Sequence, residues 1–113
     1  MTFHLTTKEA WEQQRTLPFY QPEAFAREGF IHCTDGEQNM VDTANRYYTA
    51  APDIFICLEI DTAKVAAEIK YEDPARIYPH IYGPLNTDAV VAVRTVARDA
   101  NGAFLSLGPA VAP

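Results

Sequence analysis

Residues 29–48, GFIHCTDGEQNMVDTANRYY, constrain the fold more than any other part of the chain. Gly29 is expected to end a preceding helix, because glycine readily adopts the left-handed conformation past a helix C-terminus. Residues 30–33 then form a short apolar pattern that predicts a strand. Period-two alternation places Phe30, His32 and Thr34 on one face of it. The chain therefore passes from a helix end through a strand with almost no connecting loop.

A second helix is predicted to begin directly after this strand. Thr34 with Glu37 has the spacing of a capping box, and Asp35 with Gln38 offers the same pairing one residue later. Such a start leaves free backbone N–H groups beside His32, which favours a ligand site there. Apolar residues then recur at helical spacing up to Pro52, which ends the element, and they are Met40, Val41, Ala44, Tyr47 and Tyr48.

The remaining segments predict helices early in the chain and strands late. Residues 2–6 alternate as a strand, Thr6 with Glu9 forms another capping box for a helix that buries Trp11, and residues 23–28 form a short helix. The run IFICLEI, residues 54–60, is apolar almost throughout, which is typical of a central strand covered on both faces. Further strands are predicted at residues 68–71, 80–82, 90–98 and 103–107.

The late strands define the fold class. Asn101-Gly102 predicts a type I′ hairpin turn between the last two strands, and the tail from about residue 108 is expected to be loose. Strands that follow one another, after helices concentrated in the N-terminal half, favour an α+β fold with mainly antiparallel strands in a split sheet or sandwich. Residues 1–113 are expected to form a single domain.

Composition restricts the function classes. The chain has 113 residues and a formal net charge of −6, so we expect no binding to DNA or to anionic membranes, and RNA is not an expected partner. Neither a signal peptide nor a membrane-spanning run is evident, which makes the cytoplasm the expected location. Cys33 and Cys57 lie in apolar runs without a CxxC motif and are expected to be buried reduced thiols.

The three histidines occupy similar contexts. His4, His32 and His80 each lie in or beside a short predicted strand, next to apolar or aromatic residues. Each histidine taken singly is more simply interpreted as a histidine of the core or of a sheet edge. Together they indicate either a shared cleft with acid–base chemistry or a three-histidine zinc centre with water as fourth ligand. No HxH or HxxxH spacing places two ligands in advance, so no metal is our expectation.

Tyrosines and arginines near these segments offer ligand contacts of other kinds. A tyrosine ring can stack on a planar group, although core or rim positions are its usual role. Arg46 and Arg76 have the fork that grips a phosphate, but on an exposed helix face and in a loop we interpret them as solvated surface. The tyrosines concerned are Tyr20, Tyr47, Tyr48, Tyr71, Tyr78 and Tyr82.

The motifs GFIHCT, ANRYY, LEID and YPHIYGPLN resemble those of a small bacterial family called domain of unknown function 952. The resemblance runs from about residue 3 to residue 96. It implies a fold similar to the ADP-ribosyltransferase superfamily, and a cleft that binds NAD or a nucleotide-like small molecule. Transferase activity, either ADP-ribosyl- or phosphotransferase-like, stays open, and a catalytically inactive binding module is the alternative.

The resemblance also implies roles for individual residues. His4 and Thr6 match the first-strand histidine and hydroxyl that hold a ribose of NAD, although Leu5 replaces the glycine of that pattern. His32 stands in place of the tyrosine that packs on nicotinamide. His80 falls near the expected late glutamate, and with His32 it is the candidate for acid–base catalysis. Thr43 and Tyr47 complete the cofactor pocket.

Overall fold

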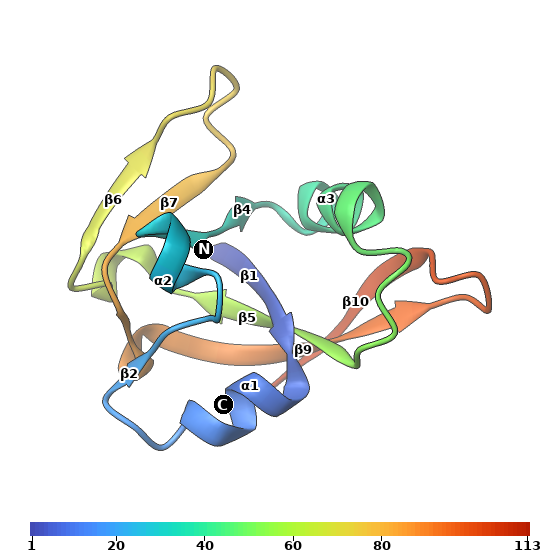
Figure 1. Cartoon of the computed structure of the whole chain (residues 1–113), viewed down its shortest axis with the longest axis horizontal. Coiled ribbons are helices and arrows are strands. Elements are labelled where there is room, and N and C mark those ends of the chain that lie inside the picture. The colour runs from blue at the N-terminus through green and yellow to red at the C-terminus, as the bar shows by residue number, and fades with distance from the viewer.

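A five-stranded antiparallel sheet forms the centre of the molecule (Figure 1). The computed structural model describes residues 1–113. In spatial order the strands of this sheet are β10 (Phe104–Val111), β9 (Val90–Arg98), β5 (Phe55–Ile60), β1 (Thr2–Thr7) and β4 (Thr34–Asp35).

Strand β5 lies at the middle of this sheet, which confirms the prediction from its continuous apolar run. It pairs with β1 on one side, where His4 lies opposite Leu58, and with β9 on the other. Its side chains alternate between two buried faces. Leu58 and Ile60 are fully buried on one face, and Cys57 is fully buried on the other.

Two smaller antiparallel sheets complete the fold. One pairs β2 with β8, and the other has the order β3–β7–β6. They pack beside the large sheet so that the whole arrangement is curled. Their bounds are β2 (Phe19–Tyr20), β3 (Ile31–His32), β6 (Glu68–Tyr71), β7 (Pro79–Tyr82) and β8 (Leu85–Asn86).

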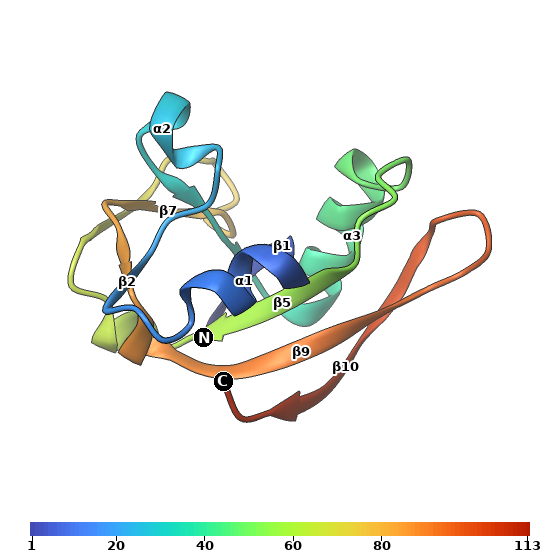
Figure 2. The same ribbon diagram turned by 60° about the horizontal axis from the view of Figure 1, so that its bottom comes forward.

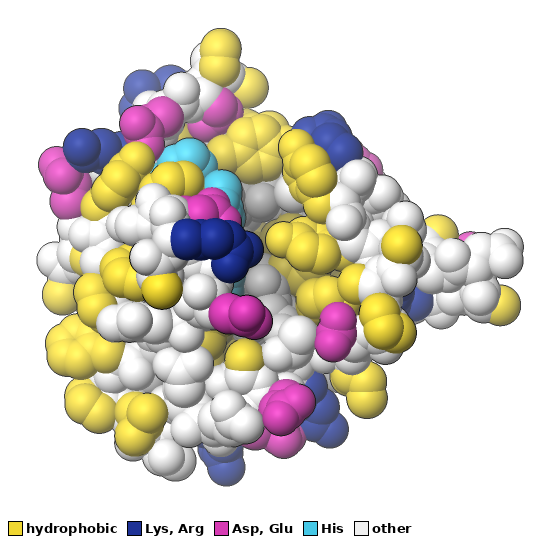
Figure 3. Space-filling view, viewed as in Figure 1, with side chains coloured by type: hydrophobic (Ala, Val, Ile, Leu, Met, Phe, Trp, Pro, Cys, Tyr) yellow, Lys and Arg dark blue, Asp and Glu magenta, His cyan; other side chains and the backbone are white.

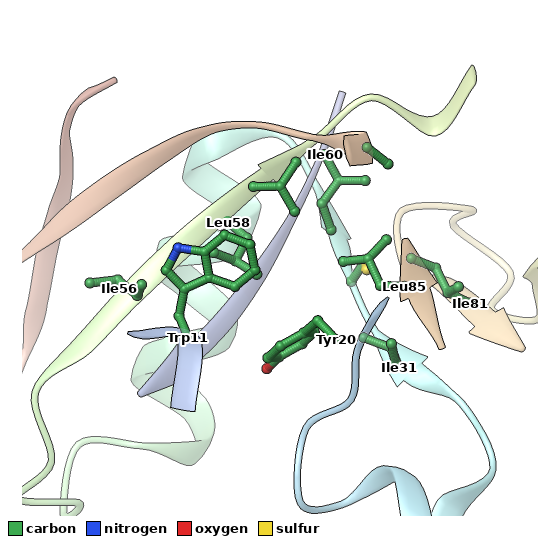
Figure 4. Packing of buried hydrophobic residues seen from close by; sticks show 11 residues of the cluster. Trp11, Tyr20, Ile31, Ile56, Leu58, Ile60, Ile81 and Leu85 are labelled. Carbon is green, nitrogen blue, oxygen red and sulfur yellow. The ribbon is translucent and has the colours of Figure 1, made fainter. Parts of the chain in front are cut away.

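The main core fills the space between the large sheet and the two smaller ones (Figure 4). Trp11 packs edge-on against Tyr20, with ring centroids 5.8 Å apart. Around them lie aliphatic side chains from all three sheets, and burying each contributes about 1.5–3 kcal/mol. The labelled members of this cluster are Trp11, Tyr20, Ile31, Ile56, Leu58, Ile60, Ile81 and Leu85.

Three α-helices lie in the first half of the chain, as predicted, and only single 3₁₀ turns follow them. They are α1 (Lys8–Gln14), α2 (Phe25–Glu28) and α3 (Glu37–Tyr47), and the turns are η1 (Thr62–Lys64) and η2 (Thr87–Ala89). Helix α3 covers the second face of the large sheet through Met40, Val41 and Ala44. In both Figure 1 and Figure 2, α3 stands apart from α2 and the β6–β7 strands, which lie at another side of the molecule.

The predicted helix starts are wrong in detail. The cap of α1 is Thr7, whose hydroxyl accepts from the Ala10 N–H at 3.2 Å, whereas Thr6 is still part of β1. Thr34 belongs to β4 and pairs with Phe3 of β1, so its hydroxyl does not cap α3. The residue before α3 is Gly36 at φ 88°, without a side-chain cap. Strand pairing outweighed the local capping signal at both places, because Thr6 pairs with Ile56 of β5 and Thr34 pairs with Phe3 of β1.

The C-terminal hairpin also differs from the prediction. Asn101 does not take the positive φ that a type I′ turn requires; instead Gly102 has φ 90° and its N–H donates to the Asp99 carbonyl. This is a type I turn followed by a left-handed glycine. Strand β10 then continues to Val111, paired with Val93 of β9, where a loose tail from about residue 108 was expected.

The architecture is thus α+β with mostly antiparallel strands, as predicted. All peptide bonds are trans. Both cysteines are free and buried, which confirms the interpretation of Cys33 and Cys57 as thiols. No helix combines the length and the apolar character needed to cross a membrane.

Candidate functional site

An open cleft of about 510 Å³ lies between α3 and the β3–β7–β6 sheet. Figure 3 shows a hollow near the middle of this face, with histidine side chains on one edge and hydrophobic side chains around it. The residues that line the cleft and carry the argument below are His32, Thr43, Arg46, Tyr47, Tyr78 and His80.

Two histidines form one wall of the cleft. Strands β3 and β7 pair in a register that places His32 directly opposite His80, and the ring centroids are 5.1 Å apart in an edge-to-face arrangement. Directly opposite residues of antiparallel strands point to the same face of a sheet, so the register itself brings the two imidazoles together. His32 is mostly exposed and His80 is largely covered.

Each histidine is hydrogen-bonded to a carboxylate. The His32 Nε2 pairs with Glu28, one helical turn earlier in sequence, because Gly29 ends α2 and turns the chain directly into β3. The His80 Nδ1 lies 3.2 Å from Glu72 Oε1. Such carboxylates fix the tautomer and the orientation of an imidazole.

The His80 ring is further held by aromatic packing. Phe30 stacks on it with centroids 4.2 Å apart and planes at 17°. The Tyr82 hydroxyl donates to Glu72, and hydrogen bonds from Tyr82 and then His80 lower the pKa of Glu72 below its ordinary value. This carboxylate is therefore firmly ionised beside His80.

The opposite wall comes from α3. Thr43, Arg46 and Tyr47 lie three and four residues apart, so they share one helix face. The Arg46 guanidinium lies 5.9 Å from the centroid of the Tyr47 ring. Tyr78, contributed by the loop before β7, meets this face, and the Thr43 hydroxyl donates to its oxygen at 3.4 Å.

The positive charge of Arg46 affects the ionisation of the groups beside it in this wall. The Tyr78 and Tyr47 hydroxyls beside Arg46 raise the pKa of its guanidinium. In return, Thr43 and then Arg46 lower the pKa of Tyr78 below its ordinary value. Arg46 is the only arginine or lysine that lines the cleft. The carboxylates of Glu72 and Asp73 also line the cleft, so Arg46 is the one place in it that suits an anionic group.

The structure brings four of the six predicted site residues to this cleft. His32 and His80, predicted as catalytic, and Thr43 and Tyr47, predicted to bind a cofactor, all line it. Tyr47 was also predicted to lie on the buried face of its helix, but it is 68% exposed. Its ring is therefore available at the rim.

His4 and Thr6 lie instead in the core. The His4 Nδ1 donates to the His32 carbonyl at 2.7 Å, and its Nε2 lies 3.0 Å from the Tyr20 hydroxyl. That hydroxyl is also 2.7 Å from Thr6 Oγ1. Neither residue lines the cleft, although His4 borders the smaller hollow described below, so their ribose-holding roles stay a prediction. Their hydrogen bonds join β1 to β2 and β3.

The three histidines do not converge in the way that the alternative three-histidine zinc centre requires. Both ring nitrogens of His4 are hydrogen-bonded inside the core, and burial lowers the pKa of His4 to about 4. No three His, Cys, Asp or Glu side chains are grouped in a way that would hold a metal ion.

The sequence interpretation assigned Arg46 to solvated surface, named Tyr78 only as one of six tyrosines near these segments, and missed Glu72. Arg46 carried a usable signal, because its spacing from Thr43 places it on the same helix face. Nothing in the sequence distinguished Tyr78 from the other tyrosines or pointed to Glu72, since both reach the cleft only through the pairing of β7 with β3 and β6.

A second hollow of about 230 Å³ adjoins the cleft between α2 and α3. Both hollows are lined by His32, Thr34, Thr43 and Tyr48. The lining of the smaller one also includes the apolar side chains of Phe3 and Met40, the buried His4, and Arg27. The two hollows together provide room for a ligand with two parts.

Comparison with known proteins places the chain among structures of the same fold. Protein CC0527 from Caulobacter crescentus is 18% identical in sequence. Its crystal structure superposes with a TM-score of 0.76 over 92% of each chain. Its solution NMR structure gives a TM-score of 0.70 over 89% of this chain and 88% of that one. No curated protein matches the sequence.

The model of the family described as "Protein of unknown function (DUF952)" matches residues 5–93. This range includes the strand pairing and the α3 wall that build the cleft. The chain belongs to the DUF952 family of proteins of unknown function.

Proposed function

We propose that the cleft binds a nucleotide-like small molecule, with NAD as the leading candidate, on a fold of the ADP-ribosyltransferase type. The observation that carries this proposal is the position of Arg46 among Tyr47, Tyr48 and Tyr78, facing the His32–His80 pair. Motif resemblance and the division of antiparallel strands among a five-stranded, a three-stranded and a two-stranded sheet support the fold assignment.

The donor set suits a nucleotide. A guanidinium binds phosphate oxygens through two parallel hydrogen bonds, and exposed tyrosine rings offer flat surfaces to a base. The imidazoles and the Thr43 hydroxyl can bond to ribose hydroxyls. The cleft volume of about 510 Å³ lies in the range of small-molecule sites. The adjoining hollow would take the second half of a dinucleotide.

This proposal covers ligand binding and does not include a transfer reaction. His80 stands where the superfamily pattern has a late glutamate, and an imidazole does not stabilise an oxocarbenium-like transition state as a carboxylate does. Transfer of ADP-ribose is therefore not part of the proposal. A binding module without turnover is compatible with the same contacts.

Calorimetric titration with NAD, ADP-ribose, AMP and adenosine tests the proposal. For the wild-type protein we expect saturable binding of the phosphate-containing ligands. Arg46→Gln should weaken their affinity about 10- to 150-fold, the loss of a charge-assisted contact of roughly 1.5–3 kcal/mol, and should leave adenosine unaffected. Arg15→Gln is the matched control, because Arg15 is exposed and lies outside the cleft.

Two results would contradict the proposal. One is the absence of heat with every nucleotide at millimolar concentration. The other is equal weakening by Arg46→Gln and Arg15→Gln, because a general charge effect would then explain the binding.

A further inference from the structure

We propose that His32 and His80 act as a general acid–base pair that hydrolyses a phosphodiester bond in a bound nucleotide. This inference rests on the nucleotide binding proposed above and adds a reaction class to it. It depends on three features of the cleft, namely the spacing of the imidazoles, their carboxylate partners and the charge of the facing wall.

The His32 and His80 rings are close enough for both to exchange protons with one small group. The imidazole centroids are 5.1 Å apart, and the pairing of β3 with β7 fixes them on two rigid strands rather than on loops. In a phosphoryl transfer the attacking and leaving oxygens lie in line on opposite sides of phosphorus. Rings in edge-to-face contact leave no room between them, so the phosphate would lie on the open side of the pair, with the acid and the base each about 2.6–3.2 Å from one of the reacting oxygens.

The carboxylates leave one free nitrogen on each ring. Glu28 takes the Nε2 of His32 and Glu72 takes the Nδ1 of His80. The other nitrogen of each ring, His32 Nδ1 and His80 Nε2, makes no hydrogen bond within the protein. A histidine oriented by a carboxylate at one nitrogen and free at the other is the arrangement of a general base or acid.

The facing wall supplies positive charge. Arg46 lines the same cleft, and its guanidinium can stabilise the charge that develops on the phosphoryl oxygens. Tyr47 and Tyr78 flank it and leave the base a surface to stack on. A cyclic nucleotide, with one base and one phosphodiester, matches this set of contacts.

The step is a simple hydrolysis. A neutral imidazole of the pair removes a proton from water as the water oxygen bonds to phosphorus. The P–O ester bond breaks, and the protonated imidazole gives its proton to the leaving ribose oxygen. The products are a phosphomonoester and a free hydroxyl, and exchange with solvent restores the original protonation of both rings.

Hydrolysis of 2′,3′-cyclic AMP, followed by ³¹P NMR, tests this inference. We expect conversion to AMP monophosphates by the wild-type protein. His32→Asn and His80→Asn should each slow it about 10²- to 10⁴-fold, and the double variant should be little slower than either. The wild-type rate should show a bell-shaped pH dependence, and each single variant should lose one limb of it.

Two further variants separate positioning from general charge effects. Glu72→Gln should reduce the rate and alter the pH profile, because Glu72 orients His80. Glu68→Gln lies on the same small sheet but outside the cleft and should leave the rate unchanged.

Calorimetry with AMP on the same preparations separates this inference from the binding proposal. AMP binding without hydrolysis by the wild type would overturn the inference and leave nucleotide binding standing. Failure of AMP to bind would overturn both. Full activity in His32→Asn or His80→Asn would also overturn the inference.

Discussion

His4 is the buried ionisable side chain whose protonation most directly opposes folding. The residue is 6% exposed, and its two ring nitrogens are hydrogen-bonded to the His32 carbonyl and the Tyr20 hydroxyl. Burial lowers the pKa of His4 from 6.5 to about 4. The network holds β1 to β3 and β2, so the neutral imidazole supports the strand that carries His32.

This predicts a loss of stability on mild acidification. Above pH 6.5 His4 is neutral in both states and has no pH effect. Between pH 6.5 and 4 the unfolded chain binds a proton that the folded protein excludes, so the free energy of unfolding falls, by about 3 kcal/mol in all. Urea unfolding as a function of pH measures this.

Two variants isolate the contribution of His4. His4→Gln should be less stable at pH 7 and should show a smaller fall from pH 6.5 to 4. His32→Gln, at an exposed position, should keep the wild-type slope. The same slope in His4→Gln and the wild type would contradict the assignment.

Tyr47 provides a second prediction at the residue scale. Its ring is 68% exposed, so its removal should not change folding stability by more than about 0.5 kcal/mol. Stacking on a base contributes about 1–3 kcal/mol, so Tyr47→Ala should weaken AMP binding about 5- to 150-fold. Tyr47→Phe keeps the ring and should bind like the wild type. Equal AMP affinity in the alanine variant would exclude stacking on Tyr47.

At the scale of elements, two glycines differ in what surrounds them. Gly29 ends α2 at φ 78° with open space around it, whereas Gly102 closes the β9–β10 hairpin at φ 90° against the Thr49 backbone. A Cβ on Gly102 would lie 2.2 Å from the Thr49 carbonyl oxygen. Both positions require a left-handed backbone, but only Gly102 also requires the absence of a side chain.

Substitution by alanine should therefore destabilise the protein more at Gly102 than at Gly29. Gly29→Ala should cost about 1–2 kcal/mol of backbone strain. Gly102→Ala adds overpacking of roughly 1–3 kcal/mol, because the contacted atom belongs to the backbone and cannot rotate away. Urea unfolding of the two variants measures the difference. A smaller loss for Gly102→Ala than for Gly29→Ala would contradict this account of the hairpin.

The elements that could be predicted are those whose signal is local. The apolar run of β5 and the bounds of β6 and β9 follow from residue pattern alone. The helix starts could not be predicted to the residue, because Thr6 and Thr34 satisfy a capping pattern and also fit a strand. Pairing with distant strands, Thr6 with β5 and Thr34 with β1, decides between the two, and the sequence near those residues does not show it.

At the scale of the whole molecule, the cleft depends on contacts between distant parts of the chain. The pairing of β3 with β7 joins His32 to His80, and the loop before β7 brings Tyr78 to α3. Of the three histidines in similar strand contexts, the structure brings two, His32 and His80, to one cleft. The third, His4, has the same local sequence character, and only the position of Tyr20 shows that it belongs to the core.

The most direct test of the account follows the three histidine ring signals by NMR while AMP is added. The His32 and His80 signals should shift together and saturate, because both line the cleft, whereas the buried His4 should shift far less. Arg46→Gln should move the saturation to higher AMP concentration. Unchanged His32 and His80 signals at millimolar AMP would contradict the claim that this cleft binds a nucleotide.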